Sequence, residues 1–222
     1  MIPESLHSAA DGKILSGVEN HIGYLVINNA DRHNAISLAM WSAAADALAV
    51  MATDTQVRAL VVTGAGGKAF ASGADIAKFE TERSTTEAVG HYHETSGRFY
   101  HALEHFPKPT LAIIRGYCIG GGLALAITCD LRLCTSASRF GVPAAKLGVG
   151  YGYAGIERLS RLVNVSTAKE IFFTARQFSA DEALQMGLVN RVLEDDKLED
   201  YAADARAVWK PHLPWATFRF YL

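Results

Sequence analysis

Apolar residues fall into short continuous runs in the first two thirds of the chain, and most of these runs end in glycine or other turn-forming residues. The runs lie within residues 21–30, 58–67, 102–119 and 130–140, and the third continues after a break at Pro107. Strands that are apolar on both faces are typical of a parallel sheet covered by helices. The runs therefore predict the strands of a largely parallel sheet.

Helical spacing appears between these strands and dominates after residue 150. Apolar residues recur at helical intervals in residues 36–51, where Asn34 or Ser37 can cap the start of a helix. Further helices are expected within residues 154–163, 167–175 and 179–187. Ser179 and Glu182 have the spacing of a capping box at the start of the last one. Strands alternating with helices indicate an α/β fold in one domain with a helical C-terminal part.

The bulk composition narrows the class of protein. The chain has 222 residues, half of them hydrophobic, and a net charge of −2, so we expect neither nucleic acid nor a membrane as a partner. Apolar runs are shorter than a membrane span, and the first residues lack a secretory signal. Cys118, Cys129 and Cys134 lie in apolar stretches, which indicates buried thiols in a reducing compartment. We expect a cytoplasmic globular protein.

Several patterns that would indicate other chemistries are incomplete. Residues 64–69 resemble a phosphate-binding loop but lack its spacing and the Ser or Thr after the lysine. Residues 150–155 have the glycine spacing of a dinucleotide-binding turn, but no clear strand precedes them. The histidines of residues 91–105 lack the glutamate of a zinc-binding helix, and no serine-hydrolase elbow occurs. We expect no metal site.

Two glycine-rich segments, residues 69–80 and 116–126, each follow a buried strand. Both expose backbone N–H groups, and the second begins a helix, whose first N–H groups are unpaired and whose dipole favours negative charge. Two such groups from neighbouring strands form an oxyanion hole without any side chain. The alternative is that the glycines only allow a helix to pack close to a strand. That alternative would be sufficient for either segment if it occurred alone.

Together with their surroundings, these segments resemble the crotonase (enoyl-CoA hydratase/isomerase) superfamily. Residues 28–37 resemble the family's first loop, which wraps the adenosine end of coenzyme A, and residues 61–76 resemble the strand and loop with the first oxyanion donor. Residues 173–192 resemble a helix pair near the family's C-terminal region. The resemblance spans about residues 23–192 and implies a ββα spiral with a helical C-terminal region.

The resemblance also implies an enzyme that acts on an acyl-CoA thioester through an enolate. The catalytic oxyanion donors would be the backbone N–H groups of Ala74 and Gly121. Coenzyme A would enter as part of the substrate, with no separate cofactor. The implied substrate-binding residues are Arg32, His33, Ala35, Ala71, Asp75, Ile76, Gly120, Pro143 and Ala144.

Two positions depart from the family's hydratases, which use two glutamates to add water across a double bond. Here the corresponding residues are Ala124 and Ala144. Residues 146–159 instead resemble methylmalonyl-CoA decarboxylases of the same superfamily, in which a tyrosine stands where Tyr151 stands here. Three hypotheses follow: a hydratase/isomerase-like enzyme, a decarboxylase that uses Tyr151, and a non-catalytic protein that binds acyl-CoA.

The C-terminal residues depart from the family as well. After about residue 207, two prolines and scattered aromatic residues stand where relatives continue with amphipathic helices. We therefore expect a core domain at residues 1–190 and a shortened, atypical segment at residues 191–222. The resemblance implies a homotrimer or a hexamer.

Overall fold

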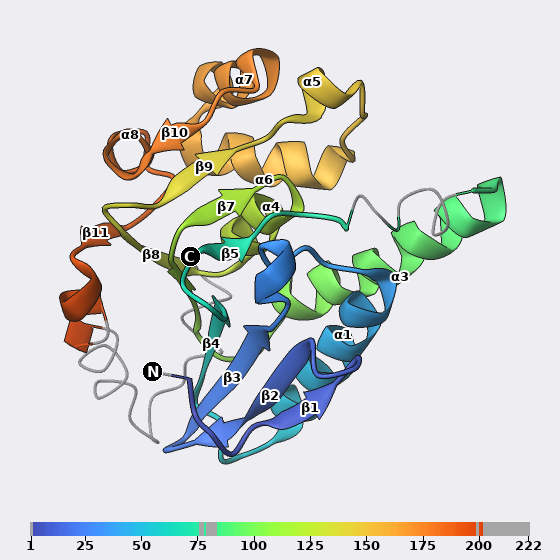
Figure 1. The fold of residues 1–222 in the computed structure, drawn as a ribbon, viewed down its shortest axis with the longest axis vertical. Coiled ribbons are helices and arrows are strands. Elements are labelled where there is room, and N and C mark those ends of the chain that lie inside the picture. Colours follow the sequence, from blue (N-terminus) through green and yellow to red (C-terminus); the bar gives the residue numbers. More distant parts are fainter. Residues whose placement is uncertain (1, 76–77, 79–83, 199, 202–222) are drawn as a thin grey trace.

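Two sheets organise the chain in the computed structural model, which describes residues 2–75, 78, 84–198 and 200–201 (Figure 1). Within these residues the larger sheet has seven strands, in the spatial order β1 (His7–Ala9), β2 (Ile14–Glu19), β3 (Ile22–Ile27), β4 (Ala59–Gly64), β6 (Thr110–Ile114), β8 (Leu131–Thr135) and β11 (Arg191–Leu193). The smaller has four, in the order β10 (Phe178–Ser179), β9 (Arg139–Gly141), β7 (Tyr117–Ile119) and β5 (Ala69–Ala71). Neighbours from β3 to β11 are parallel, as are β5, β7 and β9.

The chain passes from the larger sheet to the smaller one repeatedly, and helices follow each passage. β4 leads to β5, β6 to β7 and β8 to β9. The first pair precedes α3 (Thr86–Glu104), and the second precedes α4 (Gly121–Thr128). After the third come α5 (Ala144–Leu147), α6 (Tyr153–Val163), α7 (Val165–Thr174) and α8 (Ala180–Gln185). The predicted α/β fold, a ββα spiral with a helical C-terminal region, is confirmed.

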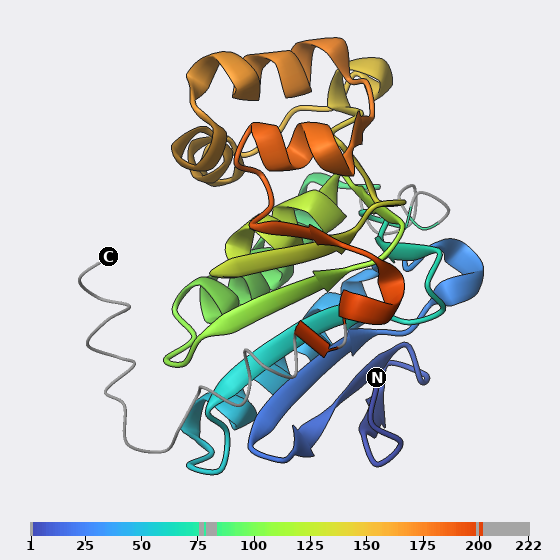
Figure 2. The ribbon, with the colours of Figure 1, turned by 90° about the vertical axis from the view of Figure 1, so that its left-hand side faces the viewer.

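Helices cover the sheets in distinct places (Figures 1 and 2). α1 (Leu38–Thr53) packs against α3 and against β2 and β3 of the larger sheet. Trp41 of α1 and Phe99 of α3 are fully buried where these helices meet, with ring centroids 4.9 Å apart. α5, α6 and α7 lie beyond the smaller sheet, at the top of Figure 1. The main core therefore lies between the larger sheet and α1, α3 and α4, and it continues through the smaller sheet to α6, α7 and α8.

Two of the predicted apolar runs each contain two strands rather than one. Residues 102–119 contain β6 and β7, and residues 130–140 contain β8 and β9, with the members of each pair in different sheets. The first division occurs at Gly116, which has a φ of 64°. A Cβ there would lie 2.0 Å from the carbonyl oxygen of Lys68, so the crossing to the smaller sheet requires glycine.

Helix ends confirm one predicted cap and correct another. Ser179 Oγ accepts from the N–H of Glu182 at 3.2 Å and Glu182 accepts from the N–H of Ser179 at 2.8 Å, which is the predicted capping box. Ser37 is the N-cap residue of α1, but its side chain makes no capping hydrogen bond. At the other end of α1, Lys108 Nζ donates to the carbonyl oxygens of residues 51, 52 and 54, each at 2.8 Å.

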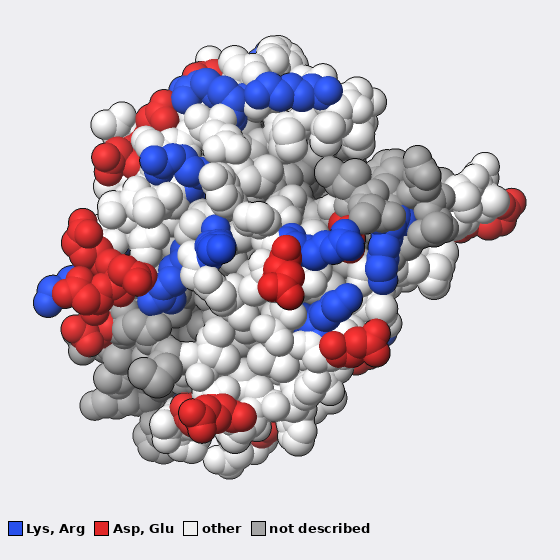
Figure 3. All heavy atoms as spheres, viewed as in Figure 1, with Lys and Arg blue, Asp and Glu red and all other residues white. Residues whose placement is uncertain are grey.

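The cysteines, the surface charges and the C-terminal residues can each be located in the structure. Cys118, Cys129 and Cys134 are buried and free. Charges of both signs are interspersed on the face in Figure 3, where acidic side chains gather over β11 and the residues after it. Among the described helices, none combines the length and apolar character needed to cross a membrane. β11 begins just past the predicted boundary at residue 190 and pairs with β8, whereas residues 202–222 lie outside the described residues.

Candidate functional site

The segment after β5 pairs with the chain at Ile36, and one of its backbone N–H groups, that of Ala74, takes no part in this pairing. Ile36 N donates to the carbonyl oxygen of Gly73 at 2.8 Å, and Asp75 N donates to the carbonyl oxygen of Ile36 at 3.1 Å. These bonds form a parallel bridge between Ile36 and Ala74. In such a bridge the central residue turns its own N–H to the opposite side. The N–H of Ala74 therefore faces away from residue 36.

The segment that leaves β7 begins helix α4 with three glycines. Gly120 is the N-cap residue, with φ 57° and ψ −120°, a conformation that glycine adopts without strain. The first hydrogen bond within the helix runs from Ala124 N to the carbonyl oxygen of Gly120, at 3.0 Å. The N–H groups of residues 121–123 therefore have no acceptor within the helix. A Cβ on Gly122 would lie 2.0 Å from the carbonyl oxygen of Ala71, so only glycine allows α4 to approach β5 this closely.

The two predicted donors, Ala74 N–H and Gly121 N–H, belong to neighbouring segments. A Cβ placed on Gly121 would lie 3.7 Å from the amide nitrogen of Ala74, and a Cβ placed on Gly73 would lie 3.0 Å from the amide nitrogen of Gly121. The Gly121 N–H also lies at the positive end of the α4 dipole. This arrangement is suited to an oxygen that carries negative charge. The use of these groups as an oxyanion hole remains a prediction.

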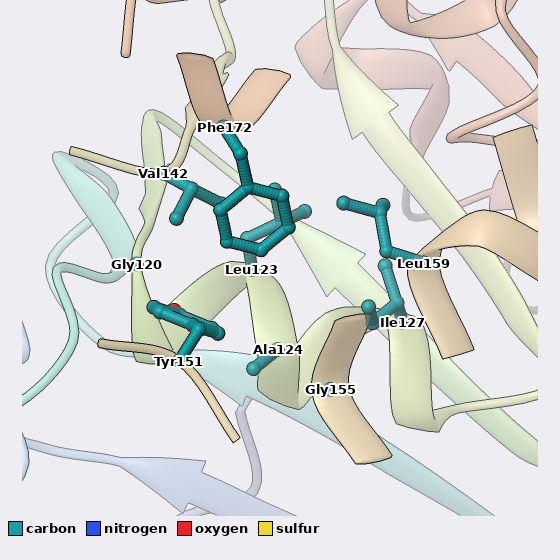
Figure 4. A pocket seen from close by; sticks show the side chains of 9 residues that line it. All are labelled: Gly120, Leu123, Ala124, Ile127, Val142, Tyr151, Gly155, Leu159 and Phe172. Atoms are coloured by element: carbon teal, nitrogen blue, oxygen red, sulfur yellow. The ribbon is translucent and has the colours of Figure 1, made fainter. Parts of the chain in front are cut away.

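A small apolar pocket opens beside the first turn of α4 (Figure 4). It is lined by Gly120, Leu123, Ala124, Ile127, Val142, Tyr151, Gly155, Leu159 and Phe172. Its cavity volume is about 10 Å³, enough for roughly one water molecule or one methyl group. The Tyr151 hydroxyl is the one polar side-chain group in this lining. Ala144 is buried at the first turn of α5, next to Pro143, which is the N-cap residue of that helix.

Tyr151 belongs to the loop before α6 and packs into this pocket. Its ring contacts Phe172 of α7 edge to face, with centroids 5.1 Å apart. Burial raises the pKa of its phenol to about 12, so the hydroxyl keeps its proton at neutral pH. A protonated phenol is a hydrogen-bond donor and a proton donor rather than a base.

Tyr100, on α3, also contacts the first turn of α4, and no motif in the sequence singles it out. Its hydroxyl donates to the carbonyl oxygen of Gly121 at 3.3 Å. Burial raises the pKa of this phenol far above its ordinary value, so it remains a donor. The indole of Trp41 lies against its ring, with centroids 5.3 Å apart, and donates to the hydroxyl of Tyr92 at 3.2 Å. An aromatic cluster therefore supports the glycine turn.

The predicted binding residues of the first loop lie beside the β5 segment. Arg32 is 3.7 Å from the carboxylate of the buried Asp75 and is itself largely exposed. His33 has a φ of 51°, and its ring meets that of Tyr117 on β7. Asn34, one of the two residues expected to cap α1, instead donates from its side chain to the carbonyl oxygens of residues 65 and 69.

The other predicted binding residues divide between the two sides of the site. Ala35 is buried next to the bridge at Ile36, and Ala71 is buried in β5. Pro143 lies near Gly120, since a Cβ on Gly120 would be 3.8 Å from Pro143 Cδ. Ile76 lies outside the described residues.

No histidine is among the described residues that line the pocket beside α4. His101 and His105 stack with ring centroids 4.1 Å apart, and their neighbour Glu104 pairs with Arg158 of α6 at 2.6 Å. Among the described residues, no group of three or more His, Cys, Asp or Glu side chains is arranged to hold a metal ion.

Comparison with known proteins places this arrangement in a family. Residues 17–218 match the family model described as enoyl-CoA hydratase/isomerase. The chain is 36% identical over 186 residues to the short-chain-enoyl-CoA hydratase of Clostridium acetobutylicum, covering 84% of this chain and 70% of that protein. It is 36% identical over 180 residues to the crotonyl-CoA hydratase of Syntrophomonas wolfei, covering 81% and 68%.

A solved structure agrees with these relatives. The crystal structure of an enoyl-CoA hydratase/carnithine racemase from Magnetospirillum magneticum superimposes with a TM-score of 0.89 at 35% identity, covering 94% of this chain and 78% of that one. Fold, sequence similarity and the ordered glycine-rich segments agree, and the chain belongs to the enoyl-CoA hydratase/isomerase family.

Proposed function

We propose that this protein is an enoyl-CoA hydratase/isomerase-like enzyme that binds an acyl-CoA thioester and stabilises its enolate. The observation that carries the proposal is the adjacency of the Ala74 and Gly121 amide nitrogens at the ends of β5 and β7. A thioester carbonyl oxygen placed between them accepts two backbone hydrogen bonds. Loss of a proton next to that carbonyl, or loss of carbon dioxide, puts negative charge on the same oxygen. In well-studied oxyanion holes each such donor lowers the activation barrier by about 2.7–4 kcal/mol.

The pocket beside α4, on the other side of the site from the two N–H groups, has few groups that could act as acid or base. No described acidic side chain lines the pocket, and Ala124 occupies its wall. General acid–base catalysis contributes about 10²–10⁴-fold, so we propose that hydration of crotonyl-CoA is weak. Tyr151 supplies one proton donor at this wall, which suits the protonation of an enolate. The arrangement favours a reaction whose enolate needs a proton delivered over one that needs a base.

Tyr151 also supports a second candidate, a decarboxylase. Decarboxylation generates the enolate without a base, because carbon dioxide leaves with the bond cleavage, and the enolate then takes one proton. The Tyr151 hydroxyl is the group in the pocket that would donate a hydrogen bond to a carboxylate or a proton to the enolate.

We also propose that this protein assembles into a homotrimer or a hexamer. Sedimentation at micromolar protein concentration tests this, and a monomer alone would contradict it.

Turnover of a thioester panel tests the proposal. Crotonyl-CoA, methylmalonyl-CoA and longer enoyl-CoA esters are each incubated with the protein, and products are followed by mass spectrometry. We expect all to be bound through their coenzyme A portion, with hydration far slower than in a two-glutamate hydratase. Hydration at an ordinary hydratase rate would contradict the assigned role of Ala124 and Ala144. Binding without turnover of any ester would leave an acyl-CoA-binding protein, the third hypothesis.

A further inference from the structure

The pocket beside α4 is closed at one end by two aromatic rings. Phe172 of α7 lies across the pocket from Ala124, and Tyr151 lies beside Ala124 (Figure 4). The two rings meet edge to face with centroids 5.1 Å apart. Both side chains pack against the buried core, so the ring positions are fixed by packing. The free space between the rings and α4 is about 10 Å³, which is room for one methyl group.

The pocket wall also discriminates by charge. All described lining side chains are hydrocarbon apart from the Tyr151 hydroxyl, and no described Lys, Arg or His lines the space. A carboxylate that entered deeply would lose its water and find the Tyr151 hydroxyl as its one partner among the lining side chains, which is unfavourable. A hydrocarbon group pays no such penalty and gains the contacts of the wall.

From these observations we propose that this pocket binds the uncharged hydrocarbon end of the acyl group, and that Phe172 limits it to short chains. The pocket adjoins Gly120, directly before the proposed oxyanion donor, so a bound acyl group reaches it from the thioester carbonyl. The substrate class is then a short, uncharged acyl-CoA thioester of about four carbons, which favours the hydratase/isomerase-like function over the decarboxylase. The inference rests on the proposed function, because the thioester carbonyl sets the direction of the chain.

Binding of unreactive thioesters to Phe172→Ala tests the inference without any turnover. Affinities for coenzyme A, butyryl-CoA, hexanoyl-CoA and octanoyl-CoA are measured by calorimetry for the wild-type protein and the variant. We expect the wild-type protein to bind butyryl-CoA at least tenfold more tightly than octanoyl-CoA. Each further methylene that the enlarged pocket buries is worth about fourfold in affinity. In the variant, octanoyl-CoA should therefore gain at least tenfold, while free coenzyme A is unchanged.

The neighbouring residue provides the matched control. Phe173 is on the same helix, has the same side chain and is 75% exposed, so Phe173→Ala should leave the order of affinities unchanged. Phe172→Leu shortens the side chain less, and should shift the preference toward hexanoyl-CoA if the alanine variant does not fold.

The outcomes separate this inference from the function on which it rests. Thioesters that bind with no dependence on chain length, or an unchanged preference in folded Phe172 variants, would overturn the role of the pocket and leave the proposed function standing. A protein that binds neither coenzyme A nor any of its esters would overturn both.

Discussion

The two sides of the candidate site are built from different material. On one side, the Ala74 and Gly121 N–H groups belong to the backbone, and their positions follow from the pairing of β5 with β7 and from the approach of α4 to β5. On the other side, the groups that would move protons are side chains, and two positions hold alanine, Ala124 and Ala144. The first side is fixed by the fold, whereas the second varies with each substitution.

This difference explains how one fold can support several reactions. A change at Gly122 disturbs strand, helix and both donors at once, because a Cβ there meets backbone only 2.0 Å away. Ala124 faces the pocket and carries no hydrogen bond from its side chain, so a change there alters the chemistry and leaves the scaffold in place. On the proposed function, the backbone half would be the shared part of the mechanism, and the pocket half would decide the product.

The largest effect is expected for Gly122→Ala, which breaks the backbone side. The added methyl group would collide with the Ala71 carbonyl, and neither β5 nor α4 can move without disturbing the sheet. We expect a loss of more than about 3 kcal/mol in the free energy of unfolding, measured by urea denaturation. Gly97→Ala is the control, since Gly97 is exposed within α3 with open space around it. That change should stabilise by about 0.5–1 kcal/mol, and equal effects at both positions would contradict the clash.

Next in size is Gly121→Pro, which removes one donor and keeps the helix start. Proline is well accommodated at the first helical position, where its missing N–H has no helical partner. We expect a rate loss of at least about 10²-fold on the best substrate, with affinity for free coenzyme A retained. Gly121→Ala keeps the N–H, and its methyl group makes only ordinary contacts of 3.4–3.8 Å, so it should remain active. Comparable rates for the proline variant and the wild-type protein would exclude Gly121 as a donor.

Tyr151→Phe should have a smaller effect, on the rate alone. It removes the proposed proton donor of the side-chain half, so we expect a loss of about tenfold or more in kcat with thioester affinity unchanged. Because burial raises the pKa of Tyr151 to about 12, the phenol stays protonated through the neutral and mildly alkaline range. The wild-type rate should therefore show no loss from this group below pH 10 and should fall only as the pH approaches 12. An unchanged kcat would reduce Tyr151 to packing.

The smallest effect is expected for Tyr100→Phe. This change tests whether a side chain helps to hold the backbone side of the site in position, because the Tyr100 hydroxyl bonds to the Gly121 carbonyl oxygen. Loss of the hydrogen bond to the Gly121 carbonyl oxygen should lower kcat by about three- to tenfold and leave KM unchanged. It should also shift the carbonyl stretch of a bound thioester to higher frequency. Tyr92→Phe changes a neighbouring phenol that bonds to Trp41 instead, so it should leave that frequency in place. A shift in both variants would indicate a general loosening of the aromatic cluster.

The strands and helices could be predicted because burial imposes their patterns locally. Apolar runs gave β3, β4 and β6, and the Ser179–Glu182 spacing gave the start of α8. The division of one run into β6 and β7 could not be predicted, because it depends on the contact between Gly116 and the distant Lys68. Local spacing alone cannot supply such a contact.

The candidate site divides in the same way. Glycine-rich segments after buried strands mark a close approach of backbone, and the resemblance to the family then pointed to Ala74 and Gly121 within them. Phe172 and Tyr100 are ordinary aromatic residues at helical spacing, and only the packing of α7 against α6 and of α3 against α4 brings them to the site. Nothing in the sequence near either residue distinguishes it from the other aromatic residues of the helices.

The order of strands in both sheets has a consequence for the nascent chain. In the larger sheet the spatial order from β1 to β11 is also the order of synthesis, and in the smaller sheet β5, β7, β9 and β10 likewise follow one another. Each strand therefore leaves the ribosome when its partner already exists, and none must insert between two strands formed before it. With chains made at about 5–20 residues per second, the sheets can lengthen one edge at a time during translation. The growing edge stays open until the next strand arrives, so a stall after β8 and before β11 would hold an unpaired parallel edge that invites association with other chains.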